Sequence, residues 1–158
     1  MNLSELGIKA RAASVLLAKM NVETKNKALI ACAEALVKES NSILEANAKD
    51  VLIGREKGMN EGLVDRLMLT EERIKGIAEG LEQVAALDDP VGEVLDMKKR
   101  PNGLLIGKKR VPLGVVGMIY EARPNVTPDA FALCFKSGNA VILRGGSDAI
   151  NSNIAIVK

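Results

Sequence analysis

The sequence predicts an α/β fold in which a helical layer precedes a β-hairpin and the opening strands of a parallel sheet. Three observations support this class. Residues 3–87 have a helical pattern, residues 91–111 hold two short runs joined by Asn-Gly, and the rest alternates strand and helix signals. We therefore divide the chain into a helical part at 1–90, a hairpin at 91–111 and a βαβα unit at 112–158.

The composition is typical of a globular protein, and the lack of a signal peptide and the presence of only two cysteines lead us to expect a cytoplasmic one. Hydrophobic residues make up 47% and charged residues 27% of the 158 residues. A net charge of +2 with 2% aromatic residues gives no basic surface for nucleic acid, so we expect no such partner. No apolar run reaches membrane-spanning length, and the segment after Met1 lacks a signal peptide's apolar core, so we expect no membrane partner either.

The sequence contains no histidine, which removes the commonest metal ligand and general base. Cys32 and Cys134 do not form a metal-binding set with nearby carboxylates, so we predict no metal site. Each cysteine lies in an apolar helical segment, and we expect both to be buried structural thiols rather than nucleophiles.

Apolar residues recur at three- and four-residue intervals from residue 3 to residue 87, which predicts amphipathic helices. Ser40 or Asn41 can cap the third helix. Thr70 can cap the last, whose first turn then holds Glu71 and Glu72. The expected inner faces include Leu29, Leu36 and Val37 in the second helix and Ile43, Leu44, Val51 and Leu52 in the third.

The segment 91–111 predicts a hairpin, because Asn102-Gly103 joins two extended runs and both residues tolerate positive φ. The runs alternate apolar and charged residues only partly. One face is therefore solvated or reserved for a partner.

Two apolar runs, 114–119 and 140–143, have the character of parallel strands buried on both faces. A helix over 127–137 separates them, with Thr127 as its cap and Pro128 in its first position. Ser147 or Asp148 is expected to cap the final helix, so this region predicts a strand–helix–strand–helix unit.

The turn Arg144-Gly145-Gly146-Ser147 is a candidate phosphate site. It follows the second strand, at the sheet edge where ligands of open α/β sheets bind. Two glycines allow close backbone approach, and the following helix N-terminus favours anions. The planar guanidinium group of Arg144 and the hydroxyl group of Ser147 are donors that suit a phosphate. The alternative is a tight turn with a solvated arginine, since the chain contains no GxGxxG or P-loop.

The loop at 120–127 carries two further candidates. The Asn125 amide could donate to a developing oxyanion, and Arg123 could bind a substrate carboxylate or phosphate. The alternative for Asn125 is stabilisation of the loop before the helix, which the local pattern alone favours.

Two segments carry a resemblance to a known family. PLGVVGMIYEARPNVT and ALCFKSGNAVILRGGSDA resemble the aldehyde dehydrogenase superfamily and, within it, the gamma-glutamyl phosphate reductases. ILEANAKDVLIGREKGM and RPNGLLIGKKR extend the resemblance upstream. It implies an aldehyde-dehydrogenase-like fold: a helical layer, a hairpin and the first part of a Rossmann-like sheet.

The resemblance also implies a reaction, the NADPH-dependent conversion of gamma-glutamyl phosphate to glutamate-5-semialdehyde in proline biosynthesis, through a cysteine thioester that accepts hydride. The superfamily places an acidic, ribose-binding residue in the turn that Arg144–Ser147 forms here. Arginine and serine in its place fit the 2′-phosphate of NADPH. Asn125 matches the superfamily's oxyanion amide, and the hairpin at 91–111 implies a homo-oligomer.

The family's nucleophilic cysteine and catalytic domain would lie downstream of Lys158. We therefore expect an N-terminal portion that is inactive by itself. An alternative hypothesis is a non-catalytic nucleotide-binding or assembly module that kept the scaffold. A third, a helical interaction domain with an incidental α/β tail, is disfavoured because polar residues concentrate at 123–125 and 144–147.

Overall fold

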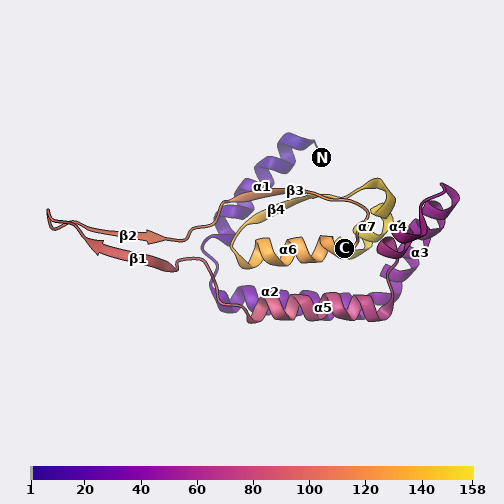
Figure 1. The fold of residues 1–158 in the computed structure, drawn as a ribbon, viewed down its shortest axis with the longest axis horizontal. Coiled ribbons are helices and arrows are strands. Elements are labelled where there is room, and N and C mark those ends of the chain that lie inside the picture. The colour runs from indigo at the N-terminus through magenta and orange to yellow at the C-terminus, as the bar shows by residue number, and fades with distance from the viewer. Residues whose placement is uncertain (1) are drawn as a thin grey trace.

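The computed structural model describes residues 2–158 and shows a helical layer, a projecting two-stranded arm and a small α/β unit (Figure 1). The mixture of helix and sheet confirms the predicted fold class. In chain order the elements are α1 (Leu3–Leu17), α2 (Val22–Lys38), α3 (Ser40–Glu56), α4 (Glu61–Leu67), α5 (Glu71–Ala86), β1 (Val94–Lys99), β2 (Leu105–Lys109), β3 (Val115–Ile119), α6 (Val126–Lys136), β4 (Ala140–Arg144), the 3₁₀ turn η1 (Ser147–Ala149) and α7 (Ile150–Val157).

Side-chain caps set the start of several helices. The Thr70 hydroxyl accepts a hydrogen bond from the Arg73 N–H at 3.1 Å, which confirms the predicted cap of α5. The cap predicted for α3 at Ser40 or Asn41 is wrong, because Ser40 is already helical and Glu39 precedes it without a side-chain cap. Glu39 instead serves both helices through its backbone, donating to α2 and accepting from α3.

The sequence pattern did not predict α4. This helix has seven residues, about two turns, which is too short for apolar periodicity to appear. The Asn60 side chain caps it by accepting from the Gly62 N–H at 2.8 Å. Val64 and Leu67 are buried and form a small second core with Val51 of α3.

The main core lies between α2 and α5, which run side by side below α6 (Figure 1). Val37 and Leu52 were expected on inner faces but are 42% and 60% exposed. Each follows a buried residue, and successive helical residues point about 100° apart. The buried members of this core are Leu29, Ala33, Leu36, Ile43, Leu69, Ile74, Ala78, Leu81, Ala85 and Ala132.

The predicted hairpin forms the arm, with β1 antiparallel to β2. Its connection is longer than an Asn-Gly turn, because the strands end at Lys99 and Leu105. Gly103 has φ +86°, whereas Asn102 keeps a negative φ and accepts from the Leu104 N–H at 3.1 Å. The arm extends away from the other elements (Figure 1) and buries none of its strand residues.

The parallel pairing of β3 with β4 places Val115 beside Ala140 and Ile119 beside Arg144. The prediction that β3 is buried on both faces is wrong, because Ile119 is 86% exposed. Helix α6 covers one face and α1 crosses the other. Within residues 2–158 the sheet has these two strands alone, so its outer edges stay open.

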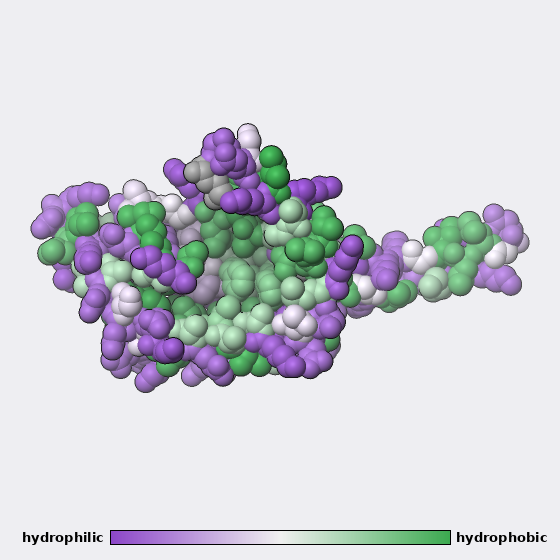
Figure 2. Space-filling view, turned by 180° about the vertical axis from the view of Figure 1, so that it is seen from behind, coloured by the Kyte–Doolittle hydropathy of each residue, from purple (hydrophilic) through white to green (hydrophobic). Residues whose placement is uncertain are grey.

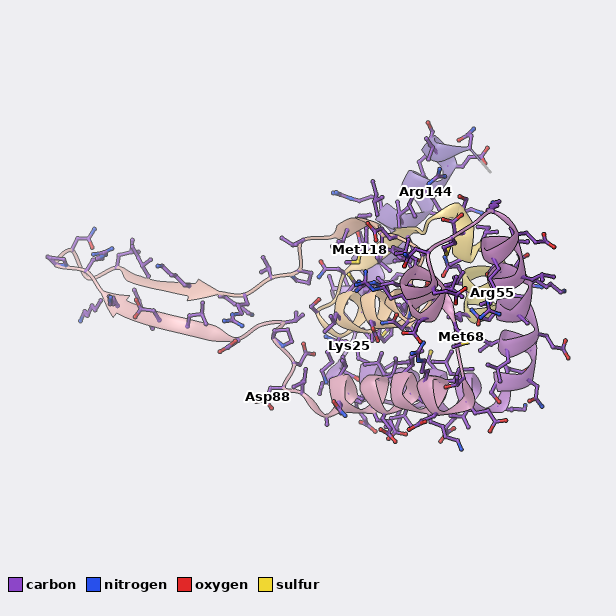
Figure 3. All side chains as sticks on the ribbon, turned by 45° about the vertical axis from the view of Figure 1, so that its right-hand side comes forward. Lys25, Arg55, Met68, Asp88, Met118 and Arg144 are labelled. Carbon is purple, nitrogen blue, oxygen red and sulfur yellow. The ribbon has the colours of Figure 1, made fainter. Side chains whose placement is uncertain are left out.

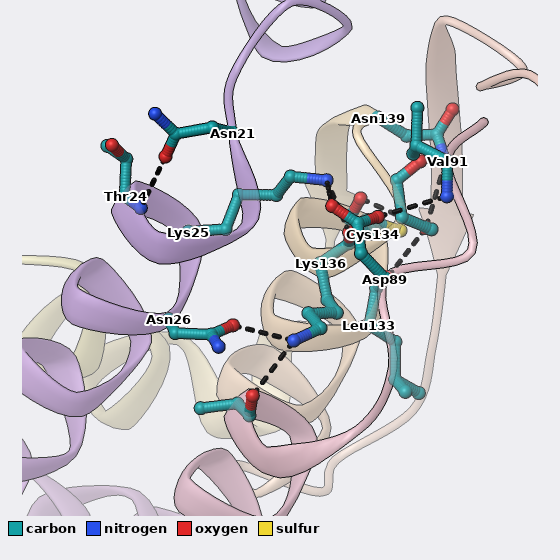
Figure 4. Close-up of polar contacts among 12 residues, drawn as sticks. Asn21, Thr24, Lys25, Asn26, Asp89, Val91, Leu133, Cys134, Lys136 and Asn139 are labelled. Carbon is teal, nitrogen blue, oxygen red and sulfur yellow. Dashed lines mark hydrogen bonds and ion pairs between the residues drawn. The ribbon is translucent and has the colours of Figure 1, made fainter. Parts of the chain in front are cut away.

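Buried charges join the base of the arm to the helices (Figure 4). The Lys25 side chain is fully buried, and its Nζ lies 2.5 Å from Asp89 Oδ2 and donates to the Lys136 carbonyl at 3.1 Å. Asp89 also accepts from the Val91 N–H at 3.0 Å. Burial raises the pKa of Asp89, but the Lys25 ammonium and the Val91 N–H outweigh it, so the pKa lies below its usual value.

Lys136 is the second buried cation of this group and is 3% exposed. Its Nζ donates to Asn26 Oδ1 at 2.6 Å and to the Ala85 carbonyl at 2.8 Å. Burial lowers the pKa of Lys136, and the nearby Lys25 charge adds to this, while Asp89 opposes it. Across residues 2–158, no helix is long and apolar enough to cross a membrane.

Candidate functional site

The loop after β3 is held by a chain of hydroxyl groups. Helix α6 begins at Val126, so the predicted cap at Thr127 and the first position for Pro128 are both wrong. The Thr127 hydroxyl instead donates to Asn153 Oδ1 at 2.9 Å and lies 2.6 Å from the Tyr120 hydroxyl, which therefore donates to it. Thr127 thus ties the start of α6 to α7 and to the end of β3.

Asn125 stands at the N-cap position of α6 but does not cap the helix with its side chain. Its Nδ2 donates to Asp129 Oδ2 at 3.2 Å, one turn along α6. Burial raises the pKa of Asp129, and the hydrogen bond from Asn125 partly offsets this. The carboxyl group therefore orients the amide and leaves its second N–H without a partner among residues 2–158.

Arg123 and Asn125 line a cleft of about 500 Å³ between this loop, α4 and the start of α5. The volume lies within the range of small-molecule sites. The α4 and α5 residues of the cleft were missed by sequence reasoning, because nothing local joins them to a loop more than 40 residues away. The remaining lining residues are Asp65, Arg66, Met68, Leu69, Arg73, Gly76, Ile77 and Asp129.

Arg73 is held by the walls of this cleft. Its Nη2 lies 2.9 Å from Asp65 Oδ1, and its Nη1 donates to the carbonyls of Asp65 and Met68, the latter at 2.7 Å. Arg73 therefore links the end of α4 to α5. In Figure 3 Met68 lies beside α5, well separated from Arg144 near α1.

Arg144 ends β4 and is exposed, and its side chain has no hydrogen-bond or ion-pair partner within residues 2–158. Its carbonyl accepts from the Tyr120 N–H at 3.1 Å. Ser147 is also exposed and begins η1. The predicted cap of α7 at Ser147 or Asp148 is wrong, because α7 starts at Ile150 after an N-cap alanine.

The two glycines of the turn differ in their surroundings. A Cβ on Gly145 would lie 2.3 Å from Asn153 Nδ2 and 3.1 Å from the Tyr120 hydroxyl oxygen. A Cβ on Gly146 would meet nothing closer than 3.5 Å. Neither residue has positive φ. Gly145 is therefore required by close packing inside the protein, whereas a methyl group at Gly146 would fit in ordinary van der Waals contact.

Asp50 of α3 occupies the N-terminus of α7, which sequence reasoning missed. Its carboxylate accepts from the Ser152 N–H at 2.8 Å, the Ser152 hydroxyl at 2.6 Å and the Asn151 amide at 2.7 Å. Asp50 is 2% exposed and about 100 residues away in sequence. The donors expected to attract a phosphate are thus already used, so an anion at this turn would rely on Arg144 and Ser147.

The structure brings the two predicted groups near one another but not into one cavity. Gly146 packs against the backbone of Glu121 and Ala122 in the loop after β3. Of the site residues predicted from the sequence, however, only Arg123 and Asn125 line the cleft beside α5. The turn after β4 lies outside that cleft.

The two cysteines lie away from both groups. Burial raises the pKa of Cys32 and of Cys134, which lowers the thiolate fraction of each. Cys32 lines an apolar cavity of about 450 Å³, and Figure 2 shows an apolar hollow on this side, between α1 and α2. In the part of the chain that the structure describes, no three His, Cys, Asp or Glu residues group as metal ligands.

Comparison with known proteins gives a consistent result. No family model matches the chain. A gamma-glutamyl phosphate reductase of Lachnospira eligens is 60% identical over 155 residues, which cover 98% of this chain and 37% of that protein. A gamma-glutamyl phosphate reductase of Caldanaerobacter subterraneus is 63% identical over 148 residues, or 94% of this chain and 36% of the relative.

Solved structures agree. The gamma-glutamyl phosphate reductase of Thermotoga maritima superposes with a TM-score of 0.95 at 49% identity, covering 99% of this chain and 38% of that one. The Saccharomyces cerevisiae protein of the same name gives a TM-score of 0.93 at 33% identity, covering 99% and 40%. The chain therefore spans a little over a third of the length of the relatives it matches.

Proposed function

We propose a function from one premise: this chain is homologous along its length to the N-terminal third of gamma-glutamyl phosphate reductases. It would form the cofactor-facing and oxyanion-binding part of an NADPH-dependent cytoplasmic reductase that converts gamma-glutamyl phosphate to glutamate-5-semialdehyde in proline biosynthesis. The observation that carries this proposal is the 60% identity over 155 residues.

The turn after β4 suits a nicotinamide cofactor with a 2′-phosphate. Arg144 and Ser147 are exposed at the carboxyl end of a parallel strand, and the Arg144 guanidinium lacks a protein partner within residues 2–158. The turn itself carries no acidic residue to repel a phosphate, although Asp148 follows it. A charge-assisted contact of this kind contributes about 1.5–3 kcal/mol, so NADPH should bind roughly ten- to a hundredfold more tightly than NADH.

The loop after β3 suits acyl chemistry. Asn125 is held by Asp129 and keeps a free N–H, which could donate to the oxyanion that forms when the acyl carbon is attacked. Arg123 lines the same cleft and would bind an anionic group of the substrate. NADPH would supply the hydride. The attacking thiolate would come from outside residues 2–158, because burial raises the pKa of both thiols described here.

The arm suits assembly with a second copy. It exposes large apolar residues, yet a two-stranded ribbon is marginal alone in water. Pairing of arms would remove this surface from solvent. The residues concerned, all 45–62% exposed, are Val94, Leu95, Met97, Leu104, Leu105 and Ile106.

The test is a hybrid enzyme in which this chain replaces the matching third of the Lachnospira eligens reductase. We expect it to oxidise glutamate-5-semialdehyde with NADP⁺ and phosphate, the reverse reaction. Asn125→Ala should lower kcat about a hundred- to a thousandfold. Arg144→Ala should abolish the preference for NADPH, and Arg11→Ala on α1 is the matched control. An inactive hybrid, or full activity in Asn125→Ala, would contradict the proposal.

A further inference from the structure

The cleft beside Asn125 contains positive charge that the folded chain leaves unpaired. Arg66 and Arg123 both line it, and neither guanidinium has an ion-pair or hydrogen-bond partner among residues 2–158. Arg73 is different, because Asp65 and two carbonyls hold it. Two unpaired guanidinium groups at one small cleft favour a ligand with a carboxylate, which arginine binds through paired N–H donors.

Negative charge also lines the cleft. Asp129 lines the cleft, is half-buried and has no cationic partner within the described chain. Burial raises its pKa, and the hydrogen bond from Asn125 offsets this only in part. An ammonium group from a ligand would supply the remaining compensation.

Part of the remaining wall is apolar, beside the paired Asp65 and Arg73. Leu69 is 7% exposed, and Met68 and Ile77 are half-buried beside it. These side chains form a surface that suits methylene groups between two polar ends of a ligand. Asn125 Nδ2 lies 3.2 Å from Asp129 Oδ2, so the expected ammonium and acyl positions are close together. A glutamyl group meets this requirement, because only two methylenes separate its Cα from its acyl carbon.

We propose that this cleft recognises the amino-acid end of the substrate. Arg66 and Arg123 bind the α-carboxylate, Asp129 binds the α-ammonium, and the apolar wall contacts the methylene chain, which directs the acyl group to Asn125. This assignment rests on the proposed function. It adds Arg66 and Asp129 as specificity-determining residues, and it predicts selection for substrates that carry an α-amino-acid group.

The first experiment uses the 158-residue chain itself. Backbone amide shifts are followed by NMR during titration with L-glutamate, and with 4-aminobutanoate, which lacks the α-carboxylate. We expect L-glutamate to shift the amides of Arg66, Arg123 and Asp129, and Arg66→Met to weaken binding about ten- to a hundredfold. Arg55→Met, on α3 and outside the cleft (Figure 3), is the control and should bind normally. Equal effects of both ligands would overturn the inference.

The second experiment uses the hybrid enzyme. With glutamate-5-semialdehyde, Arg66→Met should raise KM about tenfold or more while kcat changes little. Asp129→Asn should raise KM and also lower kcat, because Asp129 holds the Asn125 amide. With 4-aminobutanal, which lacks the α-carboxylate, Arg66→Met should leave KM unchanged. An active hybrid whose Arg66→Met variant keeps its preference for glutamate-5-semialdehyde would overturn the inference alone. An inactive hybrid would contradict the proposed function, and the NMR titration would then decide the inference.

Discussion

Different kinds of polar contact hold the segments at the two ends of the β3–β4 sheet. At the end where the strands begin, the buried Lys25 and Lys136 and the half-buried Asp89 form a group of full charges. At the end where the strands finish, Asp50 is equally buried but accepts its hydrogen bonds from the neutral donors of Asn151 and Ser152. One end is joined by ion pairing and the other by a carboxylate at a helix N-terminus.

The two ends also differ in whether their charged side chains have partners. At the beginning of the strands, every buried cation has a partner, so the group serves to fix the base of the arm. At the end of the strands, Arg66, Arg123 and Arg144 have no partners within residues 2–158. The arginines that we propose as ligand contacts all belong to this second group.

The largest expected effect comes from breaking the Asp50 contacts. Asp50→Ala removes the acceptor of α7's first turn and leaves buried donors of Ser152 unpaired. We expect a loss of about 3–4 kcal/mol in the free energy of unfolding, measured by urea denaturation. Glu45→Ala, an exposed residue of α3, is the control and should change stability by less than about 0.5 kcal/mol. A loss below about 1 kcal/mol in Asp50→Ala would show that water replaces the carboxylate.

Substitution of Asp89 at the charged end should lower the free energy of unfolding somewhat less than Asp50→Ala, because the Asp89 side chain is 17% exposed. Asp89→Ala leaves Lys25 buried without its counter-ion, and we expect a loss of about 2–3 kcal/mol. The double variant Lys25→Met/Asp89→Ala should lose less than the sum of the single variants, since it removes both charges. Additive losses in this double-mutant cycle would contradict the pairing.

The glycine turn provides a matched pair of substitutions. Gly145→Ala places a Cβ 2.3 Å from Asn153 Nδ2, so neighbours must shift, at a cost of about 1–2 kcal/mol. Gly146→Ala meets its nearest atom at 3.5 Å and should cost less than about 0.5 kcal/mol. Thermal unfolding of the two variants gives the comparison. Equal losses would mean that the backbone, rather than Tyr120 and Asn153, sets the requirement.

The last prediction concerns the pH dependence of stability at the charged end. The pKa of Asp89 is lowered in the folded state, so its ionised form stabilises the fold. This contribution is fully present above about pH 4, the unfolded-state value, and is lost as pH falls through the folded-state pKa. Asp89→Asn should therefore be less stable than the parent at pH 7, and the gap should close below pH 4. A constant gap across pH would show that Asp89 acts through packing alone.

Local patterns predicted whether most elements are helix or strand. Apolar periodicity, the Asn-Gly pair and the Thr70 cap each depend on residues that are close together in the sequence. They did not predict α4, which is too short to show a period, or the start of α6, where Thr127 bonds to Asn153 instead of capping. The burial expected for β3 also differs, because apolar runs do not specify how many strands lie beside them.

Only some of the candidate site residues could be found from the sequence, again because local patterns do not report contacts between distant segments. Arg123, Asn125 and Arg144 are polar residues at strand ends, and their positions can be found in the sequence. Asp50 and Arg66 lie on helices, where charged residues are usually solvated. Their roles arise from contacts with segments far away in the chain, and single-sequence patterns carry no information about such contacts.

The arm also determines where a protease should cleave the folded chain and whether the cleaved chain stays folded. Both of its strands are exposed and rich in lysine, so a protease should cleave there first. The segments before and after the arm nevertheless hold one another, since α5 packs against α6, α3 packs against α7, and Lys25 binds the Lys136 carbonyl. A chain nicked in the arm should therefore remain one folded particle made of two peptides, and the arm tip is the natural place to insert a foreign sequence.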